Sequence, residues 1–393
     1  MEERTLSTRL WLGLVAVVLL NPACERGDRT AAPDPVEAAV QTVVLATIDT
    51  WRRDAAGFLG ASNPSPTPFL DGLAGGGLVA ADAMAPVPLT GPSHWSVLSG
   101  RWPWQDDVRV NGDRPREGSG PVLAEILRDA GWHTAAFVSC AVLDRRSGFA
   151  AGFEHYDGDF FGASGLADVE MAERRGDETL RASLAWLGAR GREERLFLWI
   201  HLFDPHFPYA PPGGALPGER GAYLGEVAFA DAQLARLAAG LEVLGRPLDE
   251  SLWVVLSDHG EGLGDHGERS HGLILHGATT RIPFLVAGPS VPAGRFEAPS
   301  STVDVLPTIL GLLGIVAPAS DGIDLVNGAA PADRAIPLES MMGARGFGLA
   351  PVWGLRVGRW LWESSPPITS GTWRRIPRRS TISEESWRNV WST

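Results

Sequence analysis

The sequence predicts an α/β fold, and three observations lead to this prediction. Several runs are continuous, apolar and rich in β-branched residues, as expected of strands that are buried on both faces of a sheet. Segments with helical periodicity separate these runs. Polar residues directly follow three of the runs, at the strand ends where α/β sheets place their ligands. The predicted strands cover residues 42–48, 133–139, 195–203, 251–256 and 281–287.

Helices are expected between these strands. Proline near the first turn, or glycine after the last turn, marks several of them. One long helix is expected over residues 164–192, which are rich in Ala, Leu, Glu and Arg and to which we assign no chemistry. The expected helices cover residues 67–74, 94–98, 121–131, 164–192, 220–245 and 304–313.

Composition limits the classes of function. The chain has 393 residues, of which 44% are hydrophobic, so it can bury one large core with at most a small appendage. The formal net charge of −13 argues against binding to nucleic acid or to an anionic membrane surface, which need a basic footprint. A small anionic substrate would therefore need local positive charge, such as a metal ion. Only Cys24 and Cys140 are present, so no disulfide framework is expected.

Residues 1–24 have the pattern of a secretion signal. Two arginines precede an apolar run over residues 10–20 that is too short to span a bilayer comfortably. Ala23 and Cys24 at its end indicate lipoprotein processing, with Cys24 acylated, although the two residues before them fit the usual lipobox poorly. Membrane attachment through lipidated Cys24 and simple cleavage therefore both stay open. In either case we expect an exported protein, periplasmic or extracellular, with residues 25–40 as a tether.

The segment 89–100 is the first place to expect chemistry. Pro92 is well suited to the first turn of a helix, and Gly100 to its end. Thr90 would then lie at the N-terminus of this helix, where free N–H groups and the helix dipole favour an anion. Its hydroxyl could be a nucleophile that faces a bound phosphate or sulfate. The alternative is that Thr90 is only a helix N-cap.

Residues of the types that bind metals stand at the ends of three predicted strands. They are Asp49 after 42–48, Asp204 and His206 after 195–203, and Asp258 and His259 after 251–256. Each has a structural alternative as a helix cap, a turn residue or a core histidine. Together with Thr90 they favour a divalent cation, because buried carboxylates without a partner are costly and these ligand types suit Zn²⁺ or Mn²⁺. A metal that touches the threonine hydroxyl would also lower its pKa for attack.

On these residues the chain resembles the sulfatase family of the alkaline phosphatase superfamily, over roughly residues 43–362. Several blocks occur in the family order and at the family spacing, which is a more specific signal than any single motif. The blocks cover residues 48–54, 67–71, 88–100, 201–206, 257–261, 281–284 and 304–308. The resemblance implies a three-layer α/β/α sandwich with a mostly parallel central sheet and an active site at the carboxyl ends of the strands.

The resemblance also implies a domain organisation. Residues 41–330 would form the sulfatase-like catalytic domain, and residues 331–393 a small antiparallel C-terminal subdomain. Residues 337–340 and 353–360 match that subdomain, but the family sequence does not continue after about residue 364. We therefore expect the subdomain to be altered or incomplete towards its end.

For the site, the resemblance implies Asp49, Asp258 and His259 as metal ligands and Thr90 as a metal-bound nucleophile. Typical sulfatases have the motif Cys-X-Pro-X-Arg, whereas residues 90–94 read Thr-Gly-Pro-Ser-His. The Cys that is oxidised to formylglycine and the following Arg are thus both missing. Thr-X-Pro-X-His instead resembles the nucleotide pyrophosphatase/phosphodiesterase branch of the superfamily.

Three further residues are candidates for substrate contact. In the phosphodiesterase branch a downstream Asn helps hold the phosphoryl oxygens, and Asn111 stands at the corresponding position of this sequence. The alternative is that Asn111 only forms a turn. His206 and His271 are expected to contact the substrate anion or its leaving group. The alternative is that both join Asp204 around a second metal, although Asp204 and His206 are two residues apart rather than the usual four. We expect one divalent ion (Zn²⁺, Mn²⁺ or Ca²⁺), and a second stays open.

These residues predict a metal-dependent hydrolase of sulfate or phosphate esters, which acts on a small anionic ester through a covalent intermediate on Thr90. Arg52 is expected either to add positive charge near the site or to face solvent. Two alternatives stay open. One is a transferase that passes the enzyme-bound phospho group to an acceptor in the cell envelope, and the other is a non-catalytic binding protein on the same fold.

Overall fold

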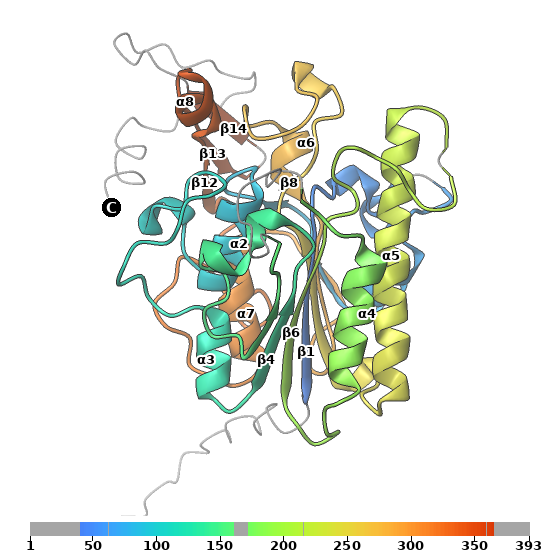
Figure 1. Cartoon of the computed structure of the whole chain (residues 1–393). Helices are drawn as coiled ribbons and strands as arrows, with labels where there is room; N and C mark the ends of the chain where they lie inside the picture. Colours follow the sequence, from blue (N-terminus) through green and yellow to red (C-terminus); the bar gives the residue numbers. More distant parts are fainter. Residues whose placement is uncertain (1–39, 62, 161–171, 215, 359, 365–393) are drawn as a thin grey trace, which may run out of the picture. The chain divides into compact units, whose positions relative to one another are not determined.

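An eight-stranded sheet runs through the middle of the fold (Figure 1). The structure, a computed structural model, describes residues 40–364 except residues 62, 161–171, 215 and 359. The strand order is β10-β2-β9-β7-β1-β6-β4-β5, and neighbours are parallel except where β9 pairs with β7 and β2. The strands are β1 (Thr42–Ile48), β2 (Leu78–Ala80), β4 (His133–Phe137), β5 (His155–Asp157), β6 (Leu196–Leu202), β7 (Ser251–Ser257), β9 (Phe284–Ala287) and β10 (Gly294–Phe296).

The central strands are apolar because both of their faces are covered. Every residue of β1, β6 and β7 is buried, as the continuous apolar runs predict. β1 lies between β6 and β7 in parallel register, with Ile48 beside Leu202 on one side and Ser257 on the other. The residues that follow these three strands therefore emerge together at one edge of the sheet.

Helices cover both faces of the sheet and form the outer layers of an α/β/α sandwich (Figure 1). On one face α2, α3 and α7 pack on strand residues such as Leu45 and Trp199. On the other face α1, α4 and α5 pack on residues such as Val44 and Trp253. The predicted sandwich is confirmed. The helices are α1 (Pro68–Gly75), α2 (Thr90–Ser99), α3 (Leu123–Asp129), α4 (Gly176–Leu187), α5 (Glu219–Val243) and α7 (Val305–Leu312).

Two predicted elements differ from the structure. Pro283 divides the strand predicted at residues 281–287 into β8 (Arg281–Ile282) and β9, which belong to different sheets. Proline lacks the N–H that a continuous ladder needs. The helix predicted at residues 164–192 is shorter, because α4 begins only at Gly176, and residues 161–171 lie outside the described part of the chain.

Two small three-stranded sheets complete the fold. One has the order β11-β3-β8, with β3 (Ala83–Met84) and β11 (Ser300–Ser301), and α6 (Gly277–Thr280) precedes β8. The other is the predicted small antiparallel sheet, with β12 (Ala335–Ser340), α8 (Met342–Phe347), β13 (Val352–Val357) and β14 (Trp360–Ser364). The boundary near residue 330 stays a prediction. The residues after 364, where the sequence departs from the family, lie outside the described residues.

The predicted signal, Cys24 and nearly all of the tether also lie outside the described residues, so they stay predictions. Among the helices that the structure describes, none has the length and apolar character needed to cross a membrane.

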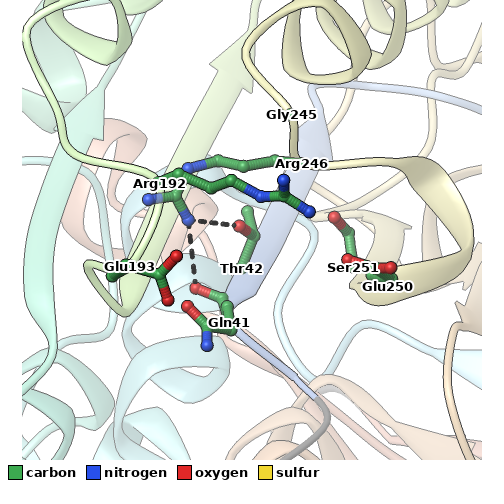
Figure 2. Close-up of a pocket in the computed structure, with 8 residues that line it drawn as sticks. All are labelled: Gln41, Thr42, Arg192, Glu193, Gly245, Arg246, Glu250 and Ser251. Atoms are coloured by element: carbon green, nitrogen blue, oxygen red, sulfur yellow. Dashed lines mark hydrogen bonds between the residues drawn. The ribbon is translucent and has the colours of Figure 1, made fainter.

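A cavity of about 410 Å³ opens at the amino ends of the central strands (Figure 2). Gln41 and Thr42 line it at the start of β1, and Ser251 lines it at the start of β7. Arg246 also lines it, but its guanidinium already donates to the Thr42 hydroxyl at 2.9 Å and to the Glu194 carbonyl at 2.8 Å. This cavity lies about 20 Å, the length of a seven-residue strand, from the polar residues at the other edge of the sheet.

Candidate active site

Thr90 is the first residue of α2, as the sequence predicts. Leu89 before it is extended, with φ −145° and ψ 140°, and the helix ends at Gly100, which is left-handed at φ 67°. Glycine suits that conformation because it has no Cβ. All ten residues of α2 are buried, and Thr90 is 2% exposed. The helix thus holds the threonine hydroxyl in the interior, at the end where the dipole favours negative charge.

The side chains of Asp49, Asp258 and His259 meet at the carboxyl edge of the central sheet. Asp49 follows β1, and Asp258 and His259 follow the neighbouring β7. One ligand atom from each lies within 4.8 Å of the other two, and all three residues are buried. The Thr90 hydroxyl donates to Asp49 Oδ2 at 3.3 Å, and its oxygen lies 3.4 Å from His259 Nε2. We call these four residues the strand-edge cluster.

Two buried carboxylate oxygens in this cluster, Asp49 Oδ1 and Asp258 Oδ2, have no hydrogen-bond partner among the described residues. The other Asp258 oxygen accepts the N–H groups of Thr50 at 3.2 Å and of His259 at 2.8 Å. A buried carboxylate oxygen without a partner is costly, and a bound cation removes that cost. Carboxylate oxygen and imidazole nitrogen are ligands of divalent ions such as Zn²⁺ and Mn²⁺. The residues present therefore fit the predicted metal.

The pKa values in the cluster also fit a cation. Burial raises the pKa of Asp258 well above its usual range, and the charge of Asp49 raises it further. Burial acts to raise the pKa of Asp49 too, but the hydrogen bond from His201 and the neighbouring histidines bring it below its usual value. Burial lowers the pKa of His259 to about 4. Neutral His259 donates from Nδ1 to the Gly260 carbonyl at 2.9 Å, which leaves the Nε2 lone pair for a metal.

A second buried group consists of Asp49, Cys140 and His201, whose ligand atoms also lie within 4.8 Å of one another. His201 Nδ1 accepts the Ser139 N–H at 3.2 Å. The imidazole proton must then be on Nε2, which lies 3.3 Å from Asp49 Oδ2 and donates to it. His201 in this state orients Asp49 and has no lone pair left for a metal. The strand-edge cluster is therefore the better metal site.

His271 lies next to His259, and His206 lies next to His271. The ring centroids of His206 and His271 are 5.3 Å apart, and those of His271 and His259 are 4.3 Å apart. Burial acts to lower the pKa of His271, but Glu261, whose Oε1 is 3.4 Å from its Nδ1, raises it above the usual value. Burial lowers the pKa of His206. The cluster thus has one neighbouring histidine that favours the charged form and one that favours the neutral form.

Asn111 lies beside the start of α2. Its Oδ1 accepts the Gly91 N–H at 2.8 Å. This bond engages the amide oxygen and leaves the two amide N–H groups as donors. The following Gly112 has a positive φ of 90°, so a turn is present here as well. The predicted substrate contact and the predicted turn are compatible at this residue.

Comparison with known proteins decides the family. A family model described as Sulfatase matches residues 41–315, which is more than half of the chain. The chain belongs to the sulfatase family. The choline-sulfatase of Rhizobium meliloti is 33% identical over 145 residues, which are 36% of this chain and 28% of the relative. The ulvan-active sulfatase of Formosa agariphila is 27% identical over 344 residues, which are 73% of this chain and 64% of the relative.

The fold comparison agrees with the family. The phosphonate monoester hydrolase of Agrobacterium radiobacter superposes with a TM-score of 0.65 at 19% identity, over 83% of this chain and 87% of that one. The predicted sulfatase and alkaline phosphatase superfamily fold is thus confirmed. This sulfatase-family chain spans at most about two thirds of the length of the first curated relatives that it matches.

His94 stands where typical sulfatases have an arginine, and in this sulfatase-family chain it is part of the core. Its Nδ1 donates to the Thr90 carbonyl at 2.8 Å, and its Nε2 accepts from the Thr47 hydroxyl at 2.9 Å. The Thr47 oxygen in turn accepts the Trp199 indole N–H at 3.0 Å. Burial lowers the pKa of His94 to about 3, so the ring is neutral. His94 therefore joins the first turn of α2 to β1 without adding charge.

Thr50, which sequence reasoning missed, shapes the turn that carries Asp49. It has a left-handed φ of 51°, which is unusual for a β-branched residue. Its hydroxyl donates to the Pro205 carbonyl at 2.8 Å, and its carbonyl accepts the Tyr223 hydroxyl at 2.9 Å. These partners lie far away in the sequence, so no local signal marks the residue. They hold the turn in a conformation that a free chain would avoid.

Asp204 is held at the start of α4 and is not part of the strand-edge cluster, so a second metal stays open. Both of its carboxylate oxygens accept the Gly176 N–H at the start of α4, at 3.0 and 3.1 Å. Within the described residues, no group of metal-binding side chains includes Asp204, His206 or His271. An aspartate at a helix N-terminus is a common structural use of this residue, and it explains Asp204 without a metal.

Arg52 neither faces solvent nor offers free charge to the site. It is 6% exposed, and its guanidinium binds the Asp54 carboxylate at 2.8 Å and the Asp265 carboxylate at 2.9 Å. It also donates to the Glu261 carbonyl at 3.0 Å. Arg52 therefore ties the loop that follows His259 to the turn that follows β1.

Proposed function

We propose that this chain is a metal-dependent hydrolase of sulfate or phosphate esters with Thr90 as the nucleophile. The position of the Thr90 hydroxyl carries the proposal. It lies at a helix start, in contact with Asp49 and His259, beside two buried carboxylate oxygens that have no hydrogen-bond partner among the described residues. Membership of the sulfatase family supports ester hydrolysis as the reaction class.

Asp49, Asp258 and His259 would hold the metal, with the Thr90 oxygen as a further ligand. When bound, the metal supplies positive charge that lowers the pKa of the hydroxyl and balances the charge of the substrate. Asp49 Oδ2 accepts the hydrogen bond of the Thr90 hydroxyl at 3.3 Å. That carboxylate is therefore placed to take the hydroxyl proton as the Thr90 oxygen attacks.

The reaction divides into two displacements. In the first, the bond from the Thr90 oxygen to sulfur or phosphorus forms while the bond to the leaving oxygen breaks. In the second, the oxygen of a water molecule bonds to the same sulfur or phosphorus atom, the bond to the Thr90 oxygen breaks, and one proton of that water ends on the Thr90 oxygen. Splitting one displacement into two through a side-chain nucleophile is a general catalytic strategy.

Neighbouring residues would protonate the leaving oxygen and bind the other oxygens of the substrate. His271 favours its charged form, since Glu261 raises its pKa, so it is the better proton donor to the leaving oxygen. The free amide N–H groups of Asn111 and the N-terminus of α2 are placed to bind the non-bridging oxygens. His206 lies beside His271, with ring centroids 5.3 Å apart, and would contact the leaving group.

A paired assay tests the proposal. Purified protein of known metal content is given an aryl sulfate, an aryl phosphate monoester and an aryl phosphate diester under the same conditions. In Thr90→Ala, the turnover of the preferred ester is expected to fall roughly 10³-fold or more, because no neighbouring side chain can take over as the nucleophile. Thr90→Ser keeps a hydroxyl and should retain measurable activity. Metal content should survive in both variants, since three ligands remain.

Each result has a distinct meaning. Undiminished turnover by Thr90→Ala would refute the nucleophile assignment. If the phosphate diester is turned over faster than the sulfate, the chain is functionally similar to the phosphodiesterase branch. If the sulfate is turned over faster, an unmodified threonine suffices for sulfate transfer. A protein that purifies without metal, gains no thermal stability from Zn²⁺, Mn²⁺ or Ca²⁺ and turns over none of the esters would be a non-catalytic binding protein.

A further inference from the structure

A small acidic cavity lies beside His206, outside the strand-edge cluster. Its volume is about 40 Å³, enough for roughly one water molecule or a group of similar size. It is lined by Glu173, Arg174, Arg175, Phe203, Asp204, His206, Pro208 and Glu226. Three carboxylates from different parts of the chain thus converge on one cavity.

Glu226, on α5, is the residue of this cavity that indicates a ligand. It is 6% exposed, and its Oε1 accepts the Ala210 N–H at 2.8 Å. Its Oε2 is buried and has no hydrogen-bond partner among the described residues. A buried carboxylate oxygen without a partner is costly. The side chain lines the cavity, so a donor placed there would meet the free oxygen.

The two arginines of the cavity neutralise it only in part, because each is paired with a carboxylate that does not line the cavity. Arg174 binds the Asp157 carboxylate at 2.9 Å and the Thr179 hydroxyl at 2.9 Å. Arg175 pairs with Asp177 at 3.3 Å. Glu173, Asp204 and Glu226 therefore leave the cavity with excess negative charge.

The pKa values agree with this charge balance. Burial raises the pKa of Glu226 to about 8, and the charges of Asp204 and Glu173 add to the effect. Burial likewise raises the pKa of Asp204 to about 6. Without a cation the cavity therefore holds protons that a positively charged ligand would replace.

The cavity adjoins the leaving-group side of the proposed active site. His206 lines it, and the His206 ring is 5.3 Å from His271, which in turn is 4.3 Å from His259. A leaving group that contacts His206, as proposed above, would therefore lie next to this cavity.

We propose that this cavity is a subsite for a primary ammonium group on the leaving group of the substrate. The proposal rests on the proposed ester hydrolysis and narrows it to esters of amino alcohols or amino sugars. An ammonium group has three donors for the free Glu226 oxygen and its neighbours. A trimethylated ammonium, in contrast, has no N–H to donate to the free Glu226 oxygen.

The test compares two esters that differ at one group. 4-(Aminomethyl)phenyl sulfate carries the ammonium, and 4-(hydroxymethyl)phenyl sulfate carries a hydroxyl of similar size; the matching phosphates serve if phosphate is preferred. In wild type, kcat/KM should favour the amine. In Glu226→Gln that preference should fall about tenfold or more, the factor expected for a lost charged hydrogen bond. Comparing the ratios between proteins removes the intrinsic reactivity difference of the esters.

Glu242→Gln, an exposed change on the same helix, is the control and should keep the wild-type ratio. Thermal melting of each variant verifies that it is folded. An unchanged ratio in folded Glu226→Gln would overturn the proposal. A second result would also overturn it. If NaCl or CaCl₂ stabilises wild type but not Glu226→Gln, and wild type shows no preference for the amine ester, the cavity binds an inorganic cation instead.

A binding measurement separates this proposal from the catalytic one. Calorimetric titration with 4-(aminomethyl)phenol and 4-(hydroxymethyl)phenol needs no turnover. The amine should bind wild type more tightly, and Glu226→Gln should lose that difference. If neither ester is hydrolysed but the amine still binds through Glu226, the hydrolase proposal fails and the subsite stands. Equal binding of the two phenols would refute the subsite even if the esters are hydrolysed.

Discussion

Asp49 and Asp258 place two buried carboxylates at the ends of neighbouring strands, and the residues around them leave room in the hydrogen bonding of both carboxylates for a cation. His201 donates to one of them, and two backbone N–H groups donate to the other, yet each keeps one oxygen without a hydrogen-bond partner among the described residues. The charge of Asp49 adds to the effect of burial and raises the pKa of Asp258. In the metal-free protein these two carboxylates lower the free energy of unfolding, and in the metal-bound protein they provide the affinity for the metal.

Asp258→Asn should therefore have opposite effects in the two states. With chelator present, the variant should melt at or above the wild-type temperature, because one of two repelling charges is gone. Metal at a hundredfold excess over its Kd should stabilise wild type by about 2.7 kcal/mol, and the variant much less at the same concentration. Thermal melting with EDTA and with added Mn²⁺ or Zn²⁺ measures both effects.

Asp249→Asn, an exposed change, is the control and should follow wild type in both conditions. Equal metal stabilisation of wild type and Asp258→Asn would remove Asp258 from the metal site. A variant that is less stable than wild type in chelator would mean that the hydrogen bonds of Asp258 outweigh its repulsion from Asp49.

At the scale of elements, α2 is held at both ends. Its start is tied to β1 through His94 and Thr47, and its end turns at Gly100. A Cβ on Gly100 would lie 3.2 Å from the Leu306 Cβ of α7 and 3.2 Å from Ser320 Cβ. The position of the Thr90 hydroxyl thus depends on contacts ten residues further along the helix.

Gly100→Ala should destabilise the protein by about 1–2 kcal/mol, the cost of a left-handed conformation for a residue with a Cβ, plus the crowding against α7. Activity per folded molecule should also fall, because α2 carries Thr90. Chemical denaturation and kcat/KM at a temperature where the variant is folded test this. Gly346→Ala, in α8, is the control, since its Cβ would meet nothing within 4 Å and its φ is not left-handed. A Gly100→Ala variant as stable as wild type would contradict the capping argument.

The α5 helix contributes a pH dependence through Glu226. Its pKa of about 8 in the folded protein exceeds the usual value near 4.5, so the folded state binds the proton more tightly than the unfolded state does. The resulting stabilisation is complete below about pH 4.5 and is lost as the pH rises to about 8. Glu226→Gln should therefore gain melting temperature relative to wild type between pH 5 and pH 8.5. Melting curves that stay parallel across this range would show that Glu226 titrates normally.

At the scale of the whole molecule, the C-terminal sheet supports the loops of the site. Glu339 of β12 is fully buried, and its Oε1 accepts from Arg109 Nε at 2.9 Å, two residues before Asn111. The next residue, Ser340, donates its hydroxyl to the Gly272 carbonyl beside His271. Residues from the last described part of the chain thus position groups that approach the substrate.

Glu339→Gln should destabilise the protein by about 1–3 kcal/mol, less than a fully buried pair because the Arg109 side chain is 27% exposed. It should also lower kcat/KM by loosening the Asn111 segment. Urea denaturation and steady-state kinetics measure the two effects. Glu297→Gln breaks an exposed pair with Arg295 and should change stability by less than about 1 kcal/mol. If both variants behave alike, the C-terminal sheet does not support the site.

The sequence alone determined the layers of the fold and the edge at which the site lies. Buried parallel strands need continuous apolar runs, so β1, β6 and β7 could be read directly, and the residues after them had to meet at one edge. The position of Thr90 followed from local helix signals. These features depend on neighbours in the chain, which a sequence displays.

Only the tertiary structure decided what the remaining polar residues do. Asp204 faces the start of α4, Arg52 binds a loop about 210 residues away, and His201 lies beside Asp49 although it looks like any strand residue. Glu226, on α5, where the sequence predicts a helix and nothing more, lines a cavity next to His206. A polar side chain takes its role from the partner it reaches, and here these partners come together only when the layers pack.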